Sequence, residues 1–394
     1  RPPRSTPLYS SAASDVYKRQ VQTITYTVTP RSGATGNCVG ATFQVVVTVN
    51  PKPTVTTLQS KVVCSNSPLI HSVSNGGGNI IPSGTRYTWT IKDDNSDISG
   101  QSAQSTSQSI FTQNLRNKTN APQYIVYLLT PVSNNGTCVG TPYELTVQVN
   151  PTPEITAKTA TICSAETFTV SPTNTVLDGV GDIVPTGTTY SWTVVDNPLV
   201  TGETEQTTFQ ANISQALTNT TNTAQTVIYT VTPKSGAAGN CIGQTFQVSV
   251  QVNPKPFIQA IPQTVCSGSA FTITPANGNG NIVPANTTYS WTFVDNPNVT
   301  GEAIGTTQAN FTQTLTNATT IAEIVTYTVT PTSGDTGNCV GNSFTVTITV
   351  NPTIQIANKT PAAICSRSSF TVTPVDGVGG DFVPNYFRIF LKRR

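Results

Sequence analysis

Apolar and polar residues alternate along the segments that lead to each Asn-Pro step of the chain. In residues 246–252, Phe and Val occupy every second position, and Gln or Ser lies between them. Residues 344–350 show the same alternation with Thr as the polar residue. A period of two is typical of a strand with one buried and one solvated face. The preceding segment, 227–232, is less regular because Ile228 falls on its polar side. A Gly/Asn-rich tip at 235–240 joins the two segments, which predicts a hairpin with a longer loop.

The hairpin is part of a long internal repeat. The Asn-Pro step recurs at spacings of 100, 103 and 98 residues, and a Trp follows each of the first three steps. The steps are Asn50-Pro51, Asn150-Pro151, Asn253-Pro254 and Asn351-Pro352, and the Trp residues are Trp89, Trp192 and Trp291. Self-similarity at a fixed period indicates tandem domains. The sequence therefore predicts the C-terminal part of one repeat (21–50), repeat 1 (52–150), repeat 2 (152–253), repeat 3 (255–351) and the N-terminal part of a further repeat (353–384).

The fold expected for each repeat is all-β. No segment carries a capped apolar stripe with a helical period, and turn residues separate many short apolar-polar runs. About seven short strands per hundred residues are typical of a Greek-key β-sandwich. We expect each Trp on the third strand, buried between the two sheets. The Asn-Pro steps fall between repeats, where Pro ends a strand and stiffens the link, so the domains are expected to form an extended rod.

Composition and charge narrow the classes of function. Only 10% of the residues are charged, yet β-branched residues are frequent, which does not fit a disordered chain. No apolar run approaches the ~18 residues of a membrane span, so we expect no membrane insertion. The basic residues gather at the two ends, and residues 21–384 hold twelve basic and seventeen acidic residues. This net charge of −5 offers no basic stripe for a phosphate backbone, so nucleic-acid binding is not expected.

The two ends depart from the repeat. Residues 1–20 share no pattern with the rest and resemble translated sequencing-adapter read-through, so we interpret them as a non-native leader. Residues 385–394 break off where the repeat requires a segment like Gly-Thr-Thr-Tyr-Ser-Trp-Thr, and we interpret them as an aberrant tail. Both ends are excluded from the reasoning on fold and function.

The repeated motifs carry a resemblance to a known family. The pattern Tyr-Thr-Val-Thr-Pro, a Ser-Gly tip, Gly-Asn-Cys-Val-Gly, an alternating strand ending in Asn-Pro, and then a Cys-Ser step runs through residues 21–384. It resembles the PKD-like and immunoglobulin-like tandem repeats of large surface proteins from gliding-type bacteria. The resemblance implies an extracellular or cell-surface location, export often by the type IX route, and roles as adhesins or stalks.

Candidates for catalysis are few. His71 is the only histidine, and no other repeat has an equivalent, so a His-based nucleophile system is not expected. We expect His71 to lie at the surface or on an edge strand. The acidic residues recur with the repeat in turn sequences such as Asp-Asn-Pro, which indicates turns rather than a paired-carboxylate site. We therefore predict no catalytic residue, no cofactor-binding residue and no enzymatic activity.

Calcium is the one metal that the sequence suggests. Asp178 with Asp182, and Asp376 with Asp381, place two carboxylates on Gly-rich loops, which suits a hard cation. The matching loops of repeats 1 and 3 carry Asn instead, which favours a turn that tolerates Asp over a metal site. Asn-X-Ser/Thr triplets, for example at Asn212, are attributed to the Thr-rich composition and indicate surface exposure only.

The cysteines are candidates for disulfide bonds, because the resemblance implies export and each complete repeat has two of them. One precedes the second strand (Cys64, Cys163, Cys266) and one enters the last strand (Cys138, Cys241, Cys339). Pairing within repeats is favoured because it lets each domain fold alone, although the two cysteines of a strict seven-stranded sandwich could lie at opposite ends. Pairing across a linker, as Cys138–Cys163, and pairing to the next repeat, as Cys64–Cys241 and Cys163–Cys339, are the alternatives.

Two functional hypotheses follow. The first is a structural one, in which the repeats form the stalk or adhesion region of a large bacterial cell-surface or secreted protein. The alternative is a glycan- or protein-binding module accessory to a secreted polysaccharide-degrading enzyme. Repeats 2 and 3 share closely similar sequences, which favours the first hypothesis, because a dedicated site would differ between copies. In either case the expected partner is an unidentified surface glycan or protein.

Overall fold

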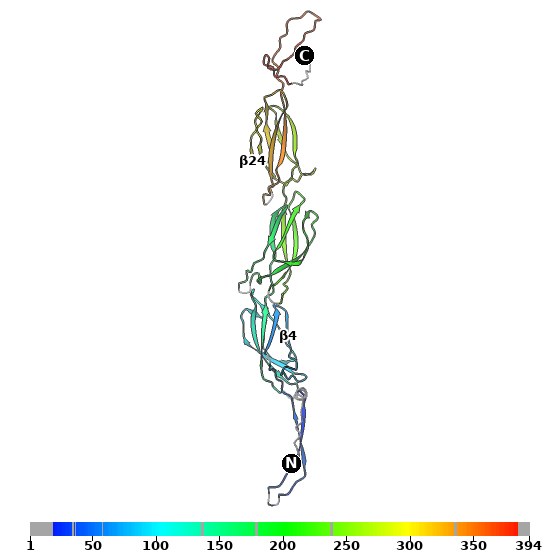
Figure 1. Ribbon diagram of the computed structural model, residues 1–394, viewed down its shortest axis with the longest axis vertical. Coiled ribbons are helices and arrows are strands. Elements are labelled where there is room, and N and C mark those ends of the chain that lie inside the picture. The colour runs from blue at the N-terminus through cyan, green and yellow to red at the C-terminus, as the bar shows by residue number, and fades with distance from the viewer. Residues whose placement is uncertain are drawn as a thin grey trace, which may run out of the picture.

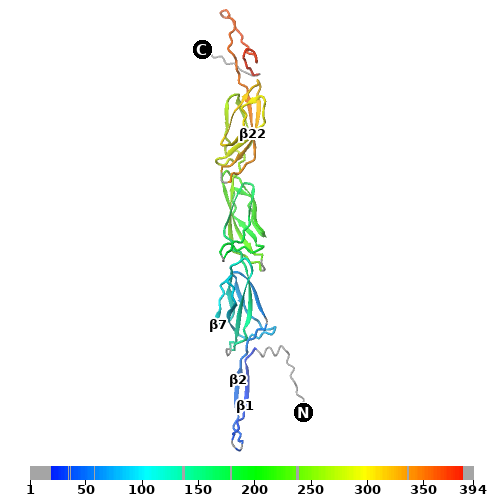
Figure 2. The same cartoon turned by 90° about the vertical axis from the view of Figure 1, so that its left-hand side faces the viewer.

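The computed structural model describes residues 19–33, 35, 37–56, 58–134, 138–177, 180–236, 239–334 and 337–384. All the regular elements in these ranges are β-strands. Two perpendicular views show three sandwich domains arranged end to end, with a thin hairpin before the first and an open segment after the last (Figures 1 and 2). The chain is therefore an all-β rod of tandem sandwiches, as its sequence predicts.

Repeat 2 shows the architecture of the sandwich. Its large sheet has the order β12-β19-β18-β14-β16, and its small sheet has the order β13-β17-β15. The strands of the large sheet are β12 (Lys158–Cys163), β19 (Phe246–Asn253), β18 (Gln225–Lys234), β14 (Thr189–Val194) and β16 (Gln206–Gln210). Those of the small sheet are β13 (Glu166–Val170), β17 (Ile213–Asn219) and β15 (Val200–Thr201). Eight strands rather than the expected seven form the domain, because the two-residue β15 adds to the small sheet.

Repeats 1 and 3 repeat this arrangement, with the small sheet divided into two strand pairs. In repeat 1 the large sheet has the order β3 (Gln59–Cys64), β11 (Tyr143–Asn150), β10 (Gln123–Val132), β5 (Arg86–Asp93) and β7 (Gln104–Gln108). In its small sheet, β4 (Pro68–His71) pairs with β8 (Phe111–Asn114), and β6 (Ile98–Ser99) pairs with β9 (Arg116–Asn117). In repeat 3 the order is β20 (Ile261–Cys266), β28 (Phe344–Asn351), β27 (Glu323–Thr332), β22 (Thr288–Phe293) and β24 (Gly305–Gln308), and the pairs are β21 (Ala270–Ile273) with β25 (Phe311–Thr314) and β23 (Val299–Thr300) with β26 (Thr316–Asn317).

The alternation seen in the sequence places the core. Phe246, Val248, Val250 and Val252 are all buried on one face of β19, while Ile228 on β18 is 41% exposed. The three Trp side chains are also buried, with exposures of 5%, 5% and 6%. Each indole Nε1 donates to a backbone carbonyl in the loop just before the edge strand that follows in the large sheet (β7, β16 or β24), at 2.8 to 3.1 Å. The predicted burial of the Trp residues is therefore confirmed, and each ring fills the space between the sheets.

The first strand of each complete repeat pairs in parallel with the last. In repeat 2, Lys158 lies opposite Val248 and Cys163 lies opposite Asn253. Both strands therefore end at the same end of the domain, which we name its C-terminal pole. The hairpin between β18 and β19, which carries Cys241, turns at the other end, the N-terminal pole. Repeats 1 and 3 have the same parallel pairing.

The parts beyond the three sandwiches are simpler. Strands β1 (Gln22–Val28) and β2 (Phe43–Val49) form an antiparallel hairpin in the segment 21–50. The segment 353–384 contains one isolated bridge, Gln355 with Phe382, and no extended strand among its residues. Residues 1–18 and 385–394, which include most of the interpreted leader and the whole tail, lie outside the described residues. Within the described residues, no helix is long and apolar enough to cross a membrane.

Candidate functional site

The two disulfide bonds lie at the junctions between sandwiches. Cys64 of repeat 1 is bonded to Cys241 of repeat 2, and Cys163 of repeat 2 is bonded to Cys339 of repeat 3. The Cα–Cα distance is 5.6 Å in both bonds, which is ordinary for a disulfide. The favoured prediction of pairing within repeats is therefore wrong, and so is the Cys138–Cys163 pairing. The bonds follow the third alternative, from each repeat to the next.

Strand order explains why a bond within one repeat cannot form. Cys163 lies beside Asn253 at the C-terminal pole, whereas Cys241 precedes β19 at the N-terminal pole. The seven residue steps of β19 alone separate the poles by about 23 Å, well beyond the ~7 Å Cα limit for a disulfide. A cysteine at a C-terminal pole can reach only the N-terminal pole of the following repeat.

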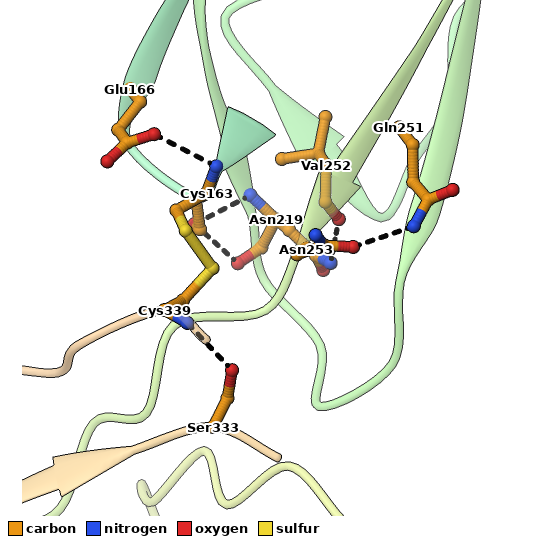
Figure 3. Close-up of a disulfide and its surroundings, with 9 residues drawn as sticks. Cys163, Glu166, Asn219, Gln251, Val252, Asn253, Ser333 and Cys339 are labelled. Carbon is orange, nitrogen blue, oxygen red and sulfur yellow. Dashed lines mark hydrogen bonds between the residues drawn. A yellow bond between two sulfur atoms is a disulfide. The ribbon is translucent and has the colours of Figure 1, made fainter. Parts of the chain in front are cut away.

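A buried polar network holds Cys163 at the junction (Figure 3). The next residue, Ser164, donates from its hydroxyl to the carbonyl oxygen of Asn219 at 3.2 Å and accepts from the Asn219 amide at 3.0 Å. The Asn219 side chain donates to the carbonyl oxygens of Val252 and Thr223 at 2.9 and 2.7 Å. The Glu166 carboxylate accepts from the Cys163 amide at 3.0 Å. These bonds tie the end of β12 to both sheets, which fixes the position of the sulfur.

The Asn of this network belongs to an Asn-X-Thr triplet in every complete repeat. Asn117, Asn219 and Asn317 are 1%, 2% and 4% exposed, and each accepts from the amide and hydroxyl of the Thr two residues later. The interpretation of Asn-X-Ser/Thr triplets as surface features is therefore wrong at these three positions. Their recurrence at the same place in each repeat was the signal that could have revealed them.

The partner cysteine is positioned by the motif around the hairpin tip. The buried Ser235 accepts from the Cys241 amide at 3.1 Å and donates its own amide to the Cys241 carbonyl at 2.8 Å. Gly243 lies so close to the carbonyl oxygen of Pro153 that a Cβ there would clash with the linker. Gly239 has φ +103° and approaches the Asn150 side chain of the preceding repeat. Gly243 is required because the linker backbone lies against it, and Gly239 is required because of its positive φ beside the Asn150 side chain.

Junction 1–2 also carries an ion pair. Arg116 of repeat 1 binds Glu154 of repeat 2 through Nη2–Oε2 at 2.7 Å and Nε–Oε1 at 3.3 Å, and Asn66 donates to the same carboxylate. The hydrogen bond to Glu154 raises the pKa of Arg116, so its charge is permanent. An open groove of about 700 Å³ runs along these residues. Its two charges neutralise each other, which gives the groove no net attraction for an ionic ligand.

The remaining cysteines occupy equivalent places in the repeats. Cys266 lies opposite Asn351 at the C-terminal pole of repeat 3, and its side chain is exposed. Cys138 is at the N-terminal pole of repeat 1, with its Sγ 3.9 Å from the carbonyl oxygen of Asn50 in the preceding segment. Cys38 and Cys365 are exposed in the two incomplete repeats. Each complete repeat therefore presents one cysteine at each pole.

The carboxylates proposed for calcium are engaged by the protein. Asp182 accepts from the Thr156 amide and hydroxyl through Oδ1, and Oδ2 pairs with Lys158. Burial alone would raise the pKa of Asp182, but the bonds from Lys158 and Thr156 outweigh it and lower the pKa. Asp381 likewise pairs with Lys359 at 2.6 Å, and this bond lowers the pKa of its carboxyl.

The other two calcium candidates have different outcomes. Asp376 accepts from the Val383 amide at 3.0 Å, which is a turn contact. Asp178 lies outside the described residues. Among the residues that the structure describes, no group of three or more His, Cys, Asp or Glu side chains is placed to hold a metal ion.

A lysine pairs with the second aspartate of both Asp-containing loops, Asp182 and Asp381. Repeats 1 and 3 carry Asn79 and Asn281 at the position of Asp182, where the Asn side chains accept from the Thr56 and Gln259 amides. In those repeats Leu58 and Ile261 replace the lysine. The aspartate and its lysine are thus present together in some repeats and absent together in the others, which explains the Asp/Asn alternation without a metal.

His71 is buried, with 2% exposure, so the expectation of a surface position is wrong. The alternative expectation is confirmed, because His71 lies on an edge strand, β4 of the two-stranded sheet β4-β8. It lies on β4 opposite Phe111, two residues after the buried Leu69, and therefore on the core face. Its Nε2 is 3.4 Å from the Tyr143 hydroxyl. Burial, together with the positive charge of Lys61, lowers the pKa of His71 to about 4. A neutral ring between aromatic neighbours is a core residue.

Comparison with known proteins places the chain in a family. A model of the PKD-like domain matches residues 15–53, 61–153, 160–256 and 263–354. No curated protein matches the chain. Among solved structures, mouse cadherin-23 repeats EC22-24 match at 10% identity and a TM-score of 0.24, over 77% of this chain and 99% of that one.

Other solved structures are similarly distant. The N-terminal four immunoglobulin domains of a Dscam1 isoform match at 10% identity and a TM-score of 0.23, over 79% of this chain and 77% of that one. An endo-fucoidan hydrolase of glycoside hydrolase family 107 matches at 13% and 0.18, over 77% and 44%. Scores this low say nothing about function. The family match covers most of the sequence, and the chain therefore belongs to the PKD-like domain family, of which it contains tandem copies.

Proposed function

We propose that the chain is a stalk segment of a large bacterial cell-surface or secreted protein, which holds an adhesive tip away from its anchor. The observation that carries this proposal is that both disulfides join neighbouring repeats instead of closing one repeat. A bond within a domain stabilises that domain, whereas a bond across a junction restrains how two domains move. Restraint at junctions is what a rigid spacer requires.

The location follows from the same bonds. Disulfides form and persist in oxidising compartments, and PKD-like and immunoglobulin-like repeats are the architecture of extracellular domains. The bonds and the family together indicate an extracellular domain. A bacterial cell surface reached by type IX export is part of our proposal, as is a partner that is a surface glycan or protein.

The stalk segment performs no catalysis in this proposal. His71, the only histidine of the chain, packs against Phe111 and Tyr143, and its Nε2 faces the hydroxyl of this buried tyrosine. Calcium is not required for rigidity in this proposal, because lysines neutralise Asp182 and Asp381.

Small-angle scattering under oxidising and reducing conditions tests the proposal. We expect a rod in the oxidised protein, and a broader distribution of end-to-end distances after reduction with each sandwich still folded. The variant Cys64→Ser/Cys241→Ser should loosen one junction in the absence of reductant. The matched control Cys38→Ser removes an exposed cysteine that forms no junction bond and should leave the profile unchanged. A flexible chain in the oxidised protein would rule out the stalk.

A further inference from the structure

The order of the bonded cysteines along the chain has a mechanical consequence. The bonds join the first cysteine to the third and the second to the fourth, in the order Cys64, Cys163, Cys241 and Cys339. The two closed loops therefore interleave, and neither lies inside the other. The backbone from residue 64 to residue 339 spans 275 residues, but a path through both bonds uses only the 78 residues between 163 and 241. At ~3.3–3.6 Å per residue, the longest possible extension falls from about 950 Å to about 270 Å.

Repeat 1 gains almost no length when it unfolds under tension. Tension from the N-terminal side enters at Pro51 and reaches Cys64 after thirteen residues along β3, then crosses the disulfide into repeat 2. Thirteen extended residues span about 45 Å, close to the length of a folded sandwich with strands of ~10 residues. Residues 65–150 are bypassed by the bond, so their unfolding does not lengthen the chain.

Repeat 3 is the mirror case. Tension crosses from Cys163 to Cys339 and leaves along β28 to Pro352, again thirteen residues later. The 84 residues from 255 to 338 are bypassed in the same way. Repeats 1 and 3 thus carry the load through one covalent strand each, and the rest of each sandwich supports that strand laterally.

Repeat 2 is held by two strands at once. Its β12 continues from the linker at Asn150 to Cys163, which is bonded to repeat 3, and its β19 runs from Cys241, which is bonded to repeat 1, to the linker at Asn253. Pulling on a chain without these bonds would slide β12 along its parallel neighbour β19. With the bonds, both strands are anchored to both neighbouring repeats, so this sliding is blocked.

Repeat 2 can lengthen only if both neighbours also unfold. Cys64 and Asn150 are paired at the C-terminal pole of folded repeat 1, so the path from there to Cys163 has only thirteen residues to extend. Folded repeat 3 imposes the same limit, because Gly341, two residues after Cys339, lies against Pro256 of the linker. We propose that the interleaved disulfides make the rod inextensible, so that no single repeat can be unravelled by tension while both bonds are intact. This inference rests on the proposed stalk function, because only a load-bearing protein needs the property.

Single-molecule stretching of the chain between marker domains tests the proposal by counting steps. An unconstrained repeat of about 100 residues releases about 300 Å beyond its folded length. We expect no such step from repeats 1–3 in the oxidised protein and three steps when both bonds are removed. The two single-bond variants make sharper predictions, because each bond still bypasses the repeats that it joins.

The variant Cys64→Ser/Cys241→Ser should release one step, from repeat 1, because the remaining bond still bypasses repeats 2 and 3. The variant Cys163→Ser/Cys339→Ser should also release one step, from repeat 3. The control Cys38→Ser should release none. Peptide mapping without reductant verifies the bonds first, and failure to find them in the oxidised protein would overturn the proposal. Three steps in the oxidised, bonded protein would also overturn it. A rod in scattering that nevertheless gives three steps would contradict only this inference, whereas a flexible oxidised chain would contradict the stalk function itself.

Discussion

Each of the two junctions between complete repeats has one disulfide of the same kind, but the two junctions differ in their polar contacts. Both have a Cα–Cα distance of 5.6 Å and loops of nearly equal length, with sequence separations of 177 and 176. Junction 1–2 adds the ion pair of Arg116 with Glu154, whereas Phe257 takes the place of Glu154 at junction 2–3. The elements that position each sulfur, namely the Cys-Ser step, the buried Asn and the Gly of the hairpin tip, are present at both. The geometry of the junction is thus set by the bond and its supports, and the surface contacts vary freely.

Removing either bond should have the largest effect and nearly the same effect at both junctions. Closing a loop of this length contributes about 5 kcal/mol by the chain-entropy estimate. The variants Cys64→Ala/Cys241→Ala and Cys163→Ala/Cys339→Ala should each lower the free energy of unfolding of the joined repeats by about that amount. Chemical denaturation of the oxidised proteins measures it, with Cys38→Ala as the control. A loss confined to one junction would show that the bonds are not equivalent.

Acid should destabilise repeat 1, on one side of junction 1–2, without affecting the Cys64–Cys241 disulfide. The unfolded chain binds a proton on His71 near pH 6.5, but burial lowers the pKa of the folded side chain to about 4. The stability of repeat 1 is therefore fully present above pH 6.5 and falls as the pH drops to 4, by about 3 kcal/mol in total.

The control for the acid effect comes from the other repeats. Val170 and Ile273 occupy the position of His71 in repeats 2 and 3. His71→Ile should remove the part of the pH dependence that is specific to repeat 1, measured by urea unfolding between pH 4 and 7. An unchanged pH profile in His71→Ile would show that another group titrates.

Gly243 and Gly341, which follow the hairpin tips, should contribute equally to stability at the two junctions. A Cβ at Gly243 would clash with the Pro153 carbonyl, and one at Gly341 would clash with Pro256. We expect Gly243→Ala and Gly341→Ala each to cost about 1–3 kcal/mol, as overpacking does, and to slow formation of the adjacent disulfide. Thermal melting and thiol quantification during refolding measure the two effects. Gly33→Ala is the matched control, because no atom lies within 4 Å of its Cβ. Equal effects in all three variants would remove the role of the linker contact.

The fold could be predicted from the sequence because its signals are local. The alternation in β19 fixes its buried face, and the recurring Trp fixes the core. The signal for His71 was also local, since Leu69 and His71 share a face of one strand, but its polar side chain suggested the surface. The structural role of the Asn-X-Thr triplets was hard to recognise in a Thr-rich sequence, although Asn117, Asn219 and Asn317 lie at the same place in their repeats.

The disulfide pairing could not be predicted, because it depends on a long-range choice. Whether Cys163 lies at one pole or the other is decided by the parallel pairing of β12 with β19, which are more than eighty residues apart in sequence. Nothing in the alternation of either strand distinguishes a parallel from an antiparallel neighbour. The observed pairing, from each repeat to the next, is one of the three that the sequence allows, but the favoured pairing within repeats is wrong.

The Gly-rich loop of repeat 2 tests whether its aspartate–lysine pair can be replaced by the residues of repeat 3, with a smaller expected effect. Asp182→Asn with Lys158→Ile gives repeat 2 the residues of repeat 3, where Asn281 makes the same backbone contact. We expect the double variant to lose at most about 1 kcal/mol, since the ion pair is partly solvated and the amide can accept the same bond. Asp182→Asn alone removes an acid whose pKa is lowered in the folded protein. The resulting loss of stability is therefore fully present above the ordinary pKa of Asp and disappears as the pH falls from there through the lowered pKa of the folded protein. Millimolar calcium should leave the melting of the wild type unchanged. Stabilisation by calcium that Asp182→Asn abolishes would instead establish a metal site.

The ion pair of junction 1–2 should have the smallest effect, although it is the most visible difference between the junctions. The Arg116 and Glu154 side chains are 35% and 31% exposed, and ion pairs in such surroundings contribute about 0–1 kcal/mol. Arg116→Thr introduces the residue that repeat 2 carries at the equivalent position, Thr218, and so removes the cation that junction 2–3 lacks. We expect a loss of no more than about 0.5 kcal/mol, reduced further by salt, and an unchanged rod in scattering of the oxidised protein. After reduction the same variant should bend more freely than the reduced wild type, because the ion pair is then one of the few restraints left at that junction. If Arg116→Thr bends the rod while the disulfide is intact, the ion pair rather than the disulfide determines the geometry of junction 1–2.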